Sequence, residues 1–125
     1  MKHIKLFSIP LFVALGLIVS CNSRNKDIQF DKNKWIEQVD PLFPSSDREK
    51  MIADLILNHK MVGLKCSELV ELLGIPDDKD TSSLSYKIII DYGHDIDPVY
   101  TKTLDFTFSK DSVITAYKVN EWKKI

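Results

Sequence analysis

The chain is poor in the residues that build the commonest catalytic and cross-linked sites. It has only two cysteines, Cys21 and Cys66, among 125 residues. It also lacks a phosphate-binding glycine loop, a dinucleotide-binding glycine pattern and a serine nucleophile elbow. These absences argue against the enzyme classes that depend on such motifs, and we predict a protein that is not an enzyme.

An excess of basic residues is absent as well. The chain has 17 Lys and Arg residues against 18 Asp and Glu residues, and the basic residues are scattered apart from the short cluster Lys123–Lys124. Nucleic-acid-binding domains usually concentrate positive charge to neutralise phosphates. We therefore expect no nucleic-acid partner and a solvated lysine pair at the C-terminus.

The N-terminus has the features of an export signal with a lipidation site. Two lysines precede an apolar run at 6–19. The end of this run, together with Ser20 and Cys21, forms the segment Leu17–Cys21, which is typical of the cleavage box of bacterial lipoproteins. A transmembrane helix needs about 20 apolar residues, whereas this run is shorter and contains a proline and a glycine. We predict a signal peptide at 1–20 and lipidation of Cys21. Simple secretion and a retained anchor are the alternatives.

Lipidation of Cys21 predicts a stable attachment to a membrane. Each buried methylene of an acyl chain contributes about 0.8 kcal/mol, and one chain alone binds only marginally. Several chains, such as palmitate, on one cysteine therefore hold the protein at the membrane. Asn22 follows the cysteine, and the absence of Asp at this place resembles lipoproteins of the outer membrane.

One small domain is expected behind the anchor. Residues 22–34 are polar and have little to bury, so we interpret 21–34 as the lipidated cysteine and a flexible tether. Residues 35–125 suffice for a single domain with a modest core. Cys66 has leucines nearby, which favours a small buried apolar side chain over a nucleophile.

The first part of this domain should form a short helical or irregular segment at 35–43 that places aromatic residues on the core, followed by two helices. Ser46–Glu49 matches a capping box, and the apolar residues after it recur at steps of three and four. This pattern predicts a helix that begins at Ser46 and ends at Gly63. A second helix should cover about Ser67–Leu73, because Gly74 and Pro76 then supply a stop signal.

The sequence changes to an alternating period after the second helix. Apolar and polar residues alternate at 84–90, 104–109 and 113–119, which is the pattern of half-buried strands. The third strand should place Val113, Thr115, Tyr117 and Val119 on one face. We predict an α+β fold in which two N-terminal helices pack on a three-stranded antiparallel sheet.

The loop Asp91–Pro98 is the best candidate for chemistry, because it holds His94, Asp95 and Asp97. Oxygen-rich clusters bind calcium, and a histidine with carboxylates binds transition metals. However, the spacing matches no calcium loop, and Asp and Gly are also ordinary turn residues. We assign no catalytic, cofactor-binding or metal-binding residue and expect no cofactor.

Two further groups have alternative interpretations. Asp77, Asp78 and Asp80 form a second acidic group, which we interpret as the solvated exit of a helix. Four aromatic residues either belong to the core and its rim, which we favour, or form a contact surface for a partner. They are Trp35, Phe43, Tyr100 and Trp122.

The order of segments along the domain resembles a known family. The segments are Trp35, Arg48–Ile56, Val62–Gly63, Glu68–Asp77 and Leu84–Tyr86. This order is similar to that of the SmpA/OmlA (BamE-like) lipoprotein domain. The most telling part is a glycine before a short helix that ends in Leu-Leu-Gly-Ile-Pro and leads to a strand with a tyrosine.

The resemblance implies a two-helix, three-strand fold shared with BLIP-like β-lactamase inhibitor repeats. It also implies a non-catalytic accessory role at the outer membrane, where the best-known members help to assemble β-barrel proteins. The chain departs from these members by an extended loop at Asp91–Lys102. Their binding residues have no counterparts that can be matched by position, so we carry none over.

These observations together predict a membrane-anchored bacterial lipoprotein that binds a protein partner of the cell envelope, with a role in envelope or outer-membrane assembly. Binding would use the sheet and the loops at its edge. One alternative is an inhibitor or ligand-sensing periplasmic module. Another is a small metal-dependent hydrolase built around His94, Asp95 and Asp97.

Overall fold

The computed structural model of the protein describes residues 26–38 and 40–125, so Cys21 and the predicted signal peptide lie outside the described residues. Three helices come first in the described part: α2 (Lys32–Ile36), α3 (Arg48–Asn58) and α4 (Cys66–Leu73). Four strands follow: β1 (Asp78–Lys79), β2 (Ser83–Asp91), β3 (Tyr100–Phe108) and β4 (Ile114–Lys123). The predicted α+β class is confirmed. None of the described helices is long and apolar enough to cross a membrane.

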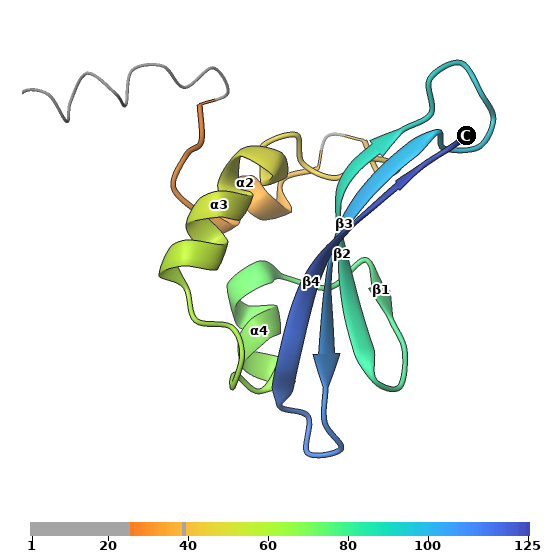
Figure 1. Ribbon diagram of the computed structural model, residues 1–125. Helices are drawn as coiled ribbons and strands as arrows, with labels where there is room; N and C mark the ends of the chain where they lie inside the picture. Colours follow the sequence, from red (N-terminus) through yellow and green to blue (C-terminus); the bar gives the residue numbers. More distant parts are fainter. Residues whose placement is uncertain (1–25, 39) are drawn as a thin grey trace, which may run out of the picture.

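The strands form one antiparallel sheet in the order β1-β2-β3-β4, and the helices all lie on the same side of it (Figure 1). The sequence predicted two helices and three strands, and around Trp35 only a short helical or irregular segment. That segment overlaps α2, whereas β1 was not predicted. These two elements have five and two residues, which is too short for a hydrophobic period to be visible. α2 instead begins at a side-chain cap, because Asp31 Oδ1 accepts a hydrogen bond from the Asn33 amide at 2.9 Å.

The core lies between the helices and the sheet. Trp35 occupies its centre, and its ring lies 5.9 Å from that of Phe30 and 6.4 Å from that of Tyr86, measured between centroids. Alternate residues of the strands and one face of each long helix supply the other buried side chains. The buried apolar residues are Trp35, Met51, Leu55, Met61, Leu69, Leu73, Leu84, Tyr86, Ile88, Leu104, Phe106 and Ile114.

The first long helix differs from its prediction at both ends. α3 has Asp47 as its N-cap without a side-chain cap bond, and Glu49 binds Lys102 Nζ of β3 at 2.7 Å rather than reaching back to the start of the helix. The predicted capping box is therefore wrong. The helix ends at Asn58, and Gly63 lies in the turn that follows, with φ 99°.

The second long helix agrees closely with its prediction. α4 begins one residue earlier than expected, at Cys66, and ends at Leu73. Gly74 follows with φ 85°, a left-handed conformation that favours glycine. A β-carbon at this position would lie 2.8 Å from Ile36 Cγ2. Gly74 therefore both ends the helix and allows α2 to approach it.

The first residues of the last strand face opposite sides of the sheet from those predicted. The pairing of β3 with β4 is irregular between Thr107 and Phe108. Ile114 is consequently the buried residue at the start of the strand, and the expectation that Val113 and Thr115 share a face with the later residues is wrong. Tyr117 and Val119 do stand opposite the buried residues of β3, as predicted.

The packed region begins before the domain boundary that we predicted at Trp35. Ile28 and Phe30 pack against the core, and the Ile28 amide donates to the Lys50 carbonyl at 3.0 Å. These two apolar residues lie within the segment that we interpreted as a tether. The packing therefore extends to within a few residues of the start of the described chain.

Candidate functional site

The outward side of β2 is closed from Ser83 to Lys87, and we call this stretch the closed edge. Three carbonyls of β2 along it accept hydrogen bonds from donors outside the long strands. The Asp80 amide donates to the Ser83 carbonyl at 3.0 Å, and the Asp77 amide donates to the Ser85 carbonyl at 2.9 Å. Arg48 Nη1 donates to the Lys87 carbonyl at 2.7 Å. Further pairing with another strand is therefore blocked here.

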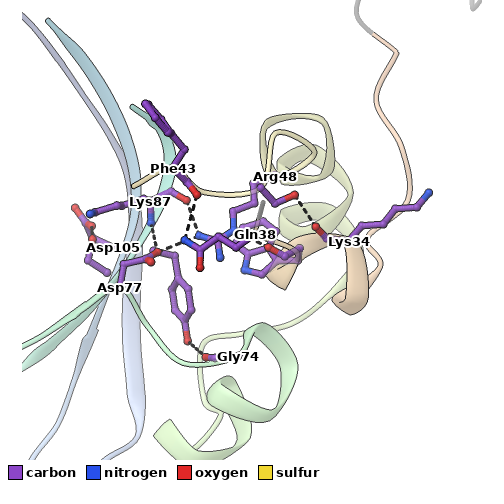
Figure 2. A network of polar contacts seen from close by, with 12 residues as sticks. Lys34, Gln38, Phe43, Arg48, Gly74, Asp77, Lys87 and Asp105 are labelled. Atoms are coloured by element: carbon purple, nitrogen blue, oxygen red, sulfur yellow. Dashed lines mark hydrogen bonds and ion pairs between the residues drawn. The ribbon is translucent and has the colours of Figure 1, made fainter. Parts of the chain in front are cut away.

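Arg48 is the central side chain of the closed edge (Figure 2). It is 5% exposed, and its guanidinium lies 5.0 Å from the centroid of the Trp35 ring. Its Nε donates to the Trp35 carbonyl at 2.8 Å, and its Nη1 also lies 3.0 Å from Asp77 Oδ2. One buried cation thus joins α2, α3, the segment after α4 and β2.

Asp77 completes this arrangement. Its Oδ2 accepts a hydrogen bond from the Lys87 amide at 2.8 Å as well as from Arg48. The pair therefore binds both backbone groups of Lys87 that a neighbouring strand would otherwise bind. Arg48 directs Nε and Nη1 to two carbonyls and one carboxylate of the domain, so this network holds neighbouring elements together.

The acidic group after α4 is exposed, as we interpreted it, but two of its carboxylates also bind neighbouring backbone groups. Besides Asp77, Asp80 accepts hydrogen bonds at its Oδ1 from the Ser82 and Ser83 amides at 2.9 and 2.8 Å. The bond from the Ser82 amide, together with the Ser83 hydroxyl, lowers the pKa of Asp80. Asp80 thus shapes the turn between β1 and β2, whereas Asp77 binds Arg48 and the Lys87 amide.

The outward side of β4 contrasts with the closed edge, and we call it the open edge. Only its start is covered, because Gly63 and Leu64 exchange two backbone hydrogen bonds of 2.8 Å with Ile114. Between Thr115 and Lys123, the backbone of β4 bonds to no described segment other than β3. A row of backbone donors and acceptors is therefore left for water or for a partner.

The sheet face opposite the helices is polar at its centre, and we call it the outer face. The Asp105 carboxylate accepts hydrogen bonds from Ser85 Oγ at 2.6 Å, from Thr103 Oγ1 at 3.2 Å and from Asn120 Nδ2. The residues come from three neighbouring strands. This network fixes the side chains across the middle of the face.

One end of the outer face carries an exposed tryptophan. Ile90, Thr101 and Trp122 stand opposite one another across three strands, on the same face as Asp105 by alternation along β3. Trp122 is 53% exposed. It thus lies in the open-edge strand, at the end of the sheet where the β2–β3 loop and the C-terminus meet (Figure 1).

The loop Asp91–Pro98, considered as a possible metal site, does not bring its side chains together. In the part of the chain that the structure describes, no group of three or more His, Cys, Asp or Glu residues is placed to hold a metal ion. Asp91 Oδ1 accepts from the Gly93 amide at 2.8 Å, and Asp95 pairs with Lys124 Nζ at 3.0 Å. His94 and Asp97 are exposed. The loop is also shorter than predicted, since β3 already begins at Tyr100.

The four aromatic residues considered as a surface are separated. Trp35 is buried, and Phe43 packs on Tyr92 with 5.7 Å between ring centroids. Tyr100 Oη donates to Glu121 Oε1 at 2.6 Å, and this bond raises the pKa of Tyr100 to about 12. The preference for core and rim therefore holds for Trp35 but not for Trp122, whose exposure the sequence did not reveal.

Cys66 lies at the start of α4 and is half-buried against the core. It is a free thiol. Its position agrees with the predicted packing role, although it is less buried than expected.

No protein-family model, no curated protein and no solved structure matches the chain. The resemblance to the SmpA/OmlA domain therefore stays a prediction from the sequence.

Proposed function

We propose that the protein is a membrane-anchored bacterial lipoprotein whose α+β domain binds a protein partner without catalysing a reaction. The anchor follows from the lipoprotein-type segment Leu17–Cys21. An outer-membrane location and a role in envelope assembly follow from Asn22 and from the resemblance to the SmpA/OmlA family. A BamE/BLIP-like fold belongs to the same proposal, because α3 and α4 precede three long strands.

Trp122 is the observation that supports partner binding best. Tryptophan is enriched among the residues that dominate the energy of protein interfaces. Trp122 is half exposed and therefore has a large apolar area left to bury. It lies beside backbone groups of the open edge that bond to no described segment beyond β3. Apolar area and free hydrogen-bonding groups are thus available at the same end of the sheet.

Site-specific photocrosslinking in intact cells tests this function. A photoreactive residue replaces Trp122 in the native, lipidated protein. In the matched control it replaces Thr107, which is exposed and lies on β3 at the end of the sheet away from Trp122. We expect envelope-protein adducts at position 122 and few at position 107. Adducts at neither position, or equal adducts at both, would contradict the proposed binding function.

The anchor is tested separately by Cys21→Ala. We expect an unprocessed or mislocalised protein without an acyl label. Continued membrane association without any label would refute lipidation and leave the binding function to be judged by the crosslinks alone.

A further inference from the structure

We propose that the open edge of β4 binds an extended, acidic segment of a partner protein as a fifth strand of the sheet. This inference rests on the proposed function and specifies how the partner would be bound. In this binding mode, main-chain hydrogen bonds supply affinity and the side chains of the edge strand supply selectivity.

The geometry of β4 suits strand addition. From Ala116 to Lys123 the strand pairs with β3 without interruption, and β4 contains no proline. Alternate residues of an edge strand direct both their amide and their carbonyl outward. These eight residues therefore present about four amides and four carbonyls to an added strand.

The contrast with the closed edge decides where the strand would add. At Lys87, both outward backbone groups of β2 are already bonded to Asp77 and Arg48. β1 covers the part of β2 before it. A partner strand would have to displace these bonds at the closed edge, whereas at the open edge it displaces only water.

The charges along β4 specify an acidic segment. Lys118 and Lys123 are exposed and form no ion pair with the described residues. Glu121, the acidic residue of this strand, is already bonded to Tyr100. Opposite charges on neighbouring strands attract, whereas lysines on an edge discourage pairing between identical chains. Glu or Asp residues opposite the two lysines are therefore favoured.

Binding of synthetic peptides to the full-length chain in detergent micelles tests this inference. The probe is a peptide as long as β4, made of Thr, Val and Glu with glutamates on both faces, and its control has Lys in place of each Glu. The readout is the chemical shift and the hydrogen exchange of each backbone amide. We expect the Glu peptide to shift the amides of 116–123 and to slow their exchange, and the Lys peptide to have no effect.

A charge-reversal variant makes the test specific. Lys118→Glu combined with Lys123→Glu should weaken binding of the Glu peptide about tenfold, the effect of replacing two cross-strand attractions by repulsions. Lys79→Glu, on β1 at the other edge of the sheet, is the matched control and should leave binding unchanged. Equal binding of both peptides, or shifts confined to the outer face around Asp105, would overturn the inference.

The cellular crosslinks separate this inference from the function on which it rests. If adducts at position 122 disappear in the charge-reversal variant, strand addition is supported. If the adducts persist there, the protein still binds a partner but not through the lysines of β4, and the inference is wrong. If the unaltered chain gives no adducts at all, the proposed function itself is contradicted.

Discussion

The closed edge and the open edge of the sheet meet the same physical requirement in opposite ways. Backbone amides and carbonyls at the margin of a sheet need hydrogen-bond partners. At the closed edge, β1 and the Arg48–Asp77 pair supply these partners from within the domain. At the open edge, beyond Ile114, the described chain supplies none.

The comparison separates a sheet margin that is bonded within the domain from one whose backbone groups have no partner among the described residues. A buried guanidinium needs compensation for its lost hydration, and Arg48 receives it from two carbonyls and a carboxylate on different elements. Beyond Ile114, no described side chain or strand binds the outward backbone groups of the open edge. Substitutions at the closed edge should therefore change stability, whereas those at the open edge should change binding.

The largest effect is expected for Arg48→Ala. Removing one partner of a buried charge pair typically costs 3–5 kcal/mol. Because Asp77 keeps some contact with water, we expect the free energy of unfolding to fall by about 3 kcal/mol. Urea denaturation measures this loss.

Lys50→Ala is the matched control for Arg48. Lys50 lies on the same helix, is exposed, and is 3.9 Å from Asp47. Its loss should cost less than about 0.5 kcal/mol. Similar losses of unfolding free energy in the two variants would show that the closed edge is no more important for stability than the rest of the surface.

A somewhat smaller loss is expected for Gly74→Val. The φ of 85° is unfavourable for a side chain, and the added β-carbon would meet Ile36 Cγ2 at 2.8 Å. Left-handed strain and overpacking together should destabilise the protein by about 2–3 kcal/mol. Tyr86 also donates to the Gly74 carbonyl at 2.7 Å, so this change would disturb the side of the core next to the closed edge.

Combining Gly74→Val with Ile36→Ala tests the proposed cause. The second change removes the methyl group that the valine would meet, so part of the loss should be recovered relative to Ile36→Ala alone. An unchanged melting temperature in Gly74→Val would show that the glycine conformation is not required.

The smallest effect is expected near the open edge, at Tyr100. Its hydrogen bond to Glu121 raises its pKa to about 12, above the usual value of about 10. A raised pKa in the folded state means that the bond stabilises the protein fully below about pH 10 and loses this effect as the pH rises toward 12.

Glu121→Gln should lower the pKa of Tyr100 toward 10 because the negative charge is lost. Ultraviolet absorbance of the phenolate measures this change, and Tyr100→Phe identifies the signal. A pKa that does not change in Glu121→Gln would show that Glu121 does not hold the phenol.

The parts of the fold that the sequence predicted are those with long hydrophobic periods. α4 and the three long strands have several apolar residues at regular spacing, and Gly74 marks a helix end by a local rule. α2 and β1 have too few residues to show a period. The register irregularity in β4 depends on its pairing with β3, which a single strand does not reveal.

The candidate site was harder to predict because its contacts are distant in the sequence. Arg48 stands in a charged run that resembles a solvated helix start, yet its partners Asp77 and Lys87 lie 29 and 39 residues away. Trp122 differs from buried Trp35 only in its tertiary position. The loop with His94 shows the converse, because residues that are close in the sequence do not converge on a common point in the described structure.

Hydrogen exchange of the backbone amides of the full-length chain tests the central contrast most directly. We predict that the Lys87 amide is protected as strongly as amides inside the sheet, because Asp77 binds it. Alternate amides of β4 from Ala116 to Lys123 should exchange about a hundredfold faster than their neighbours that face β3. Uniform protection along β4, or rapid exchange at Lys87, would contradict the account of one closed and one open edge.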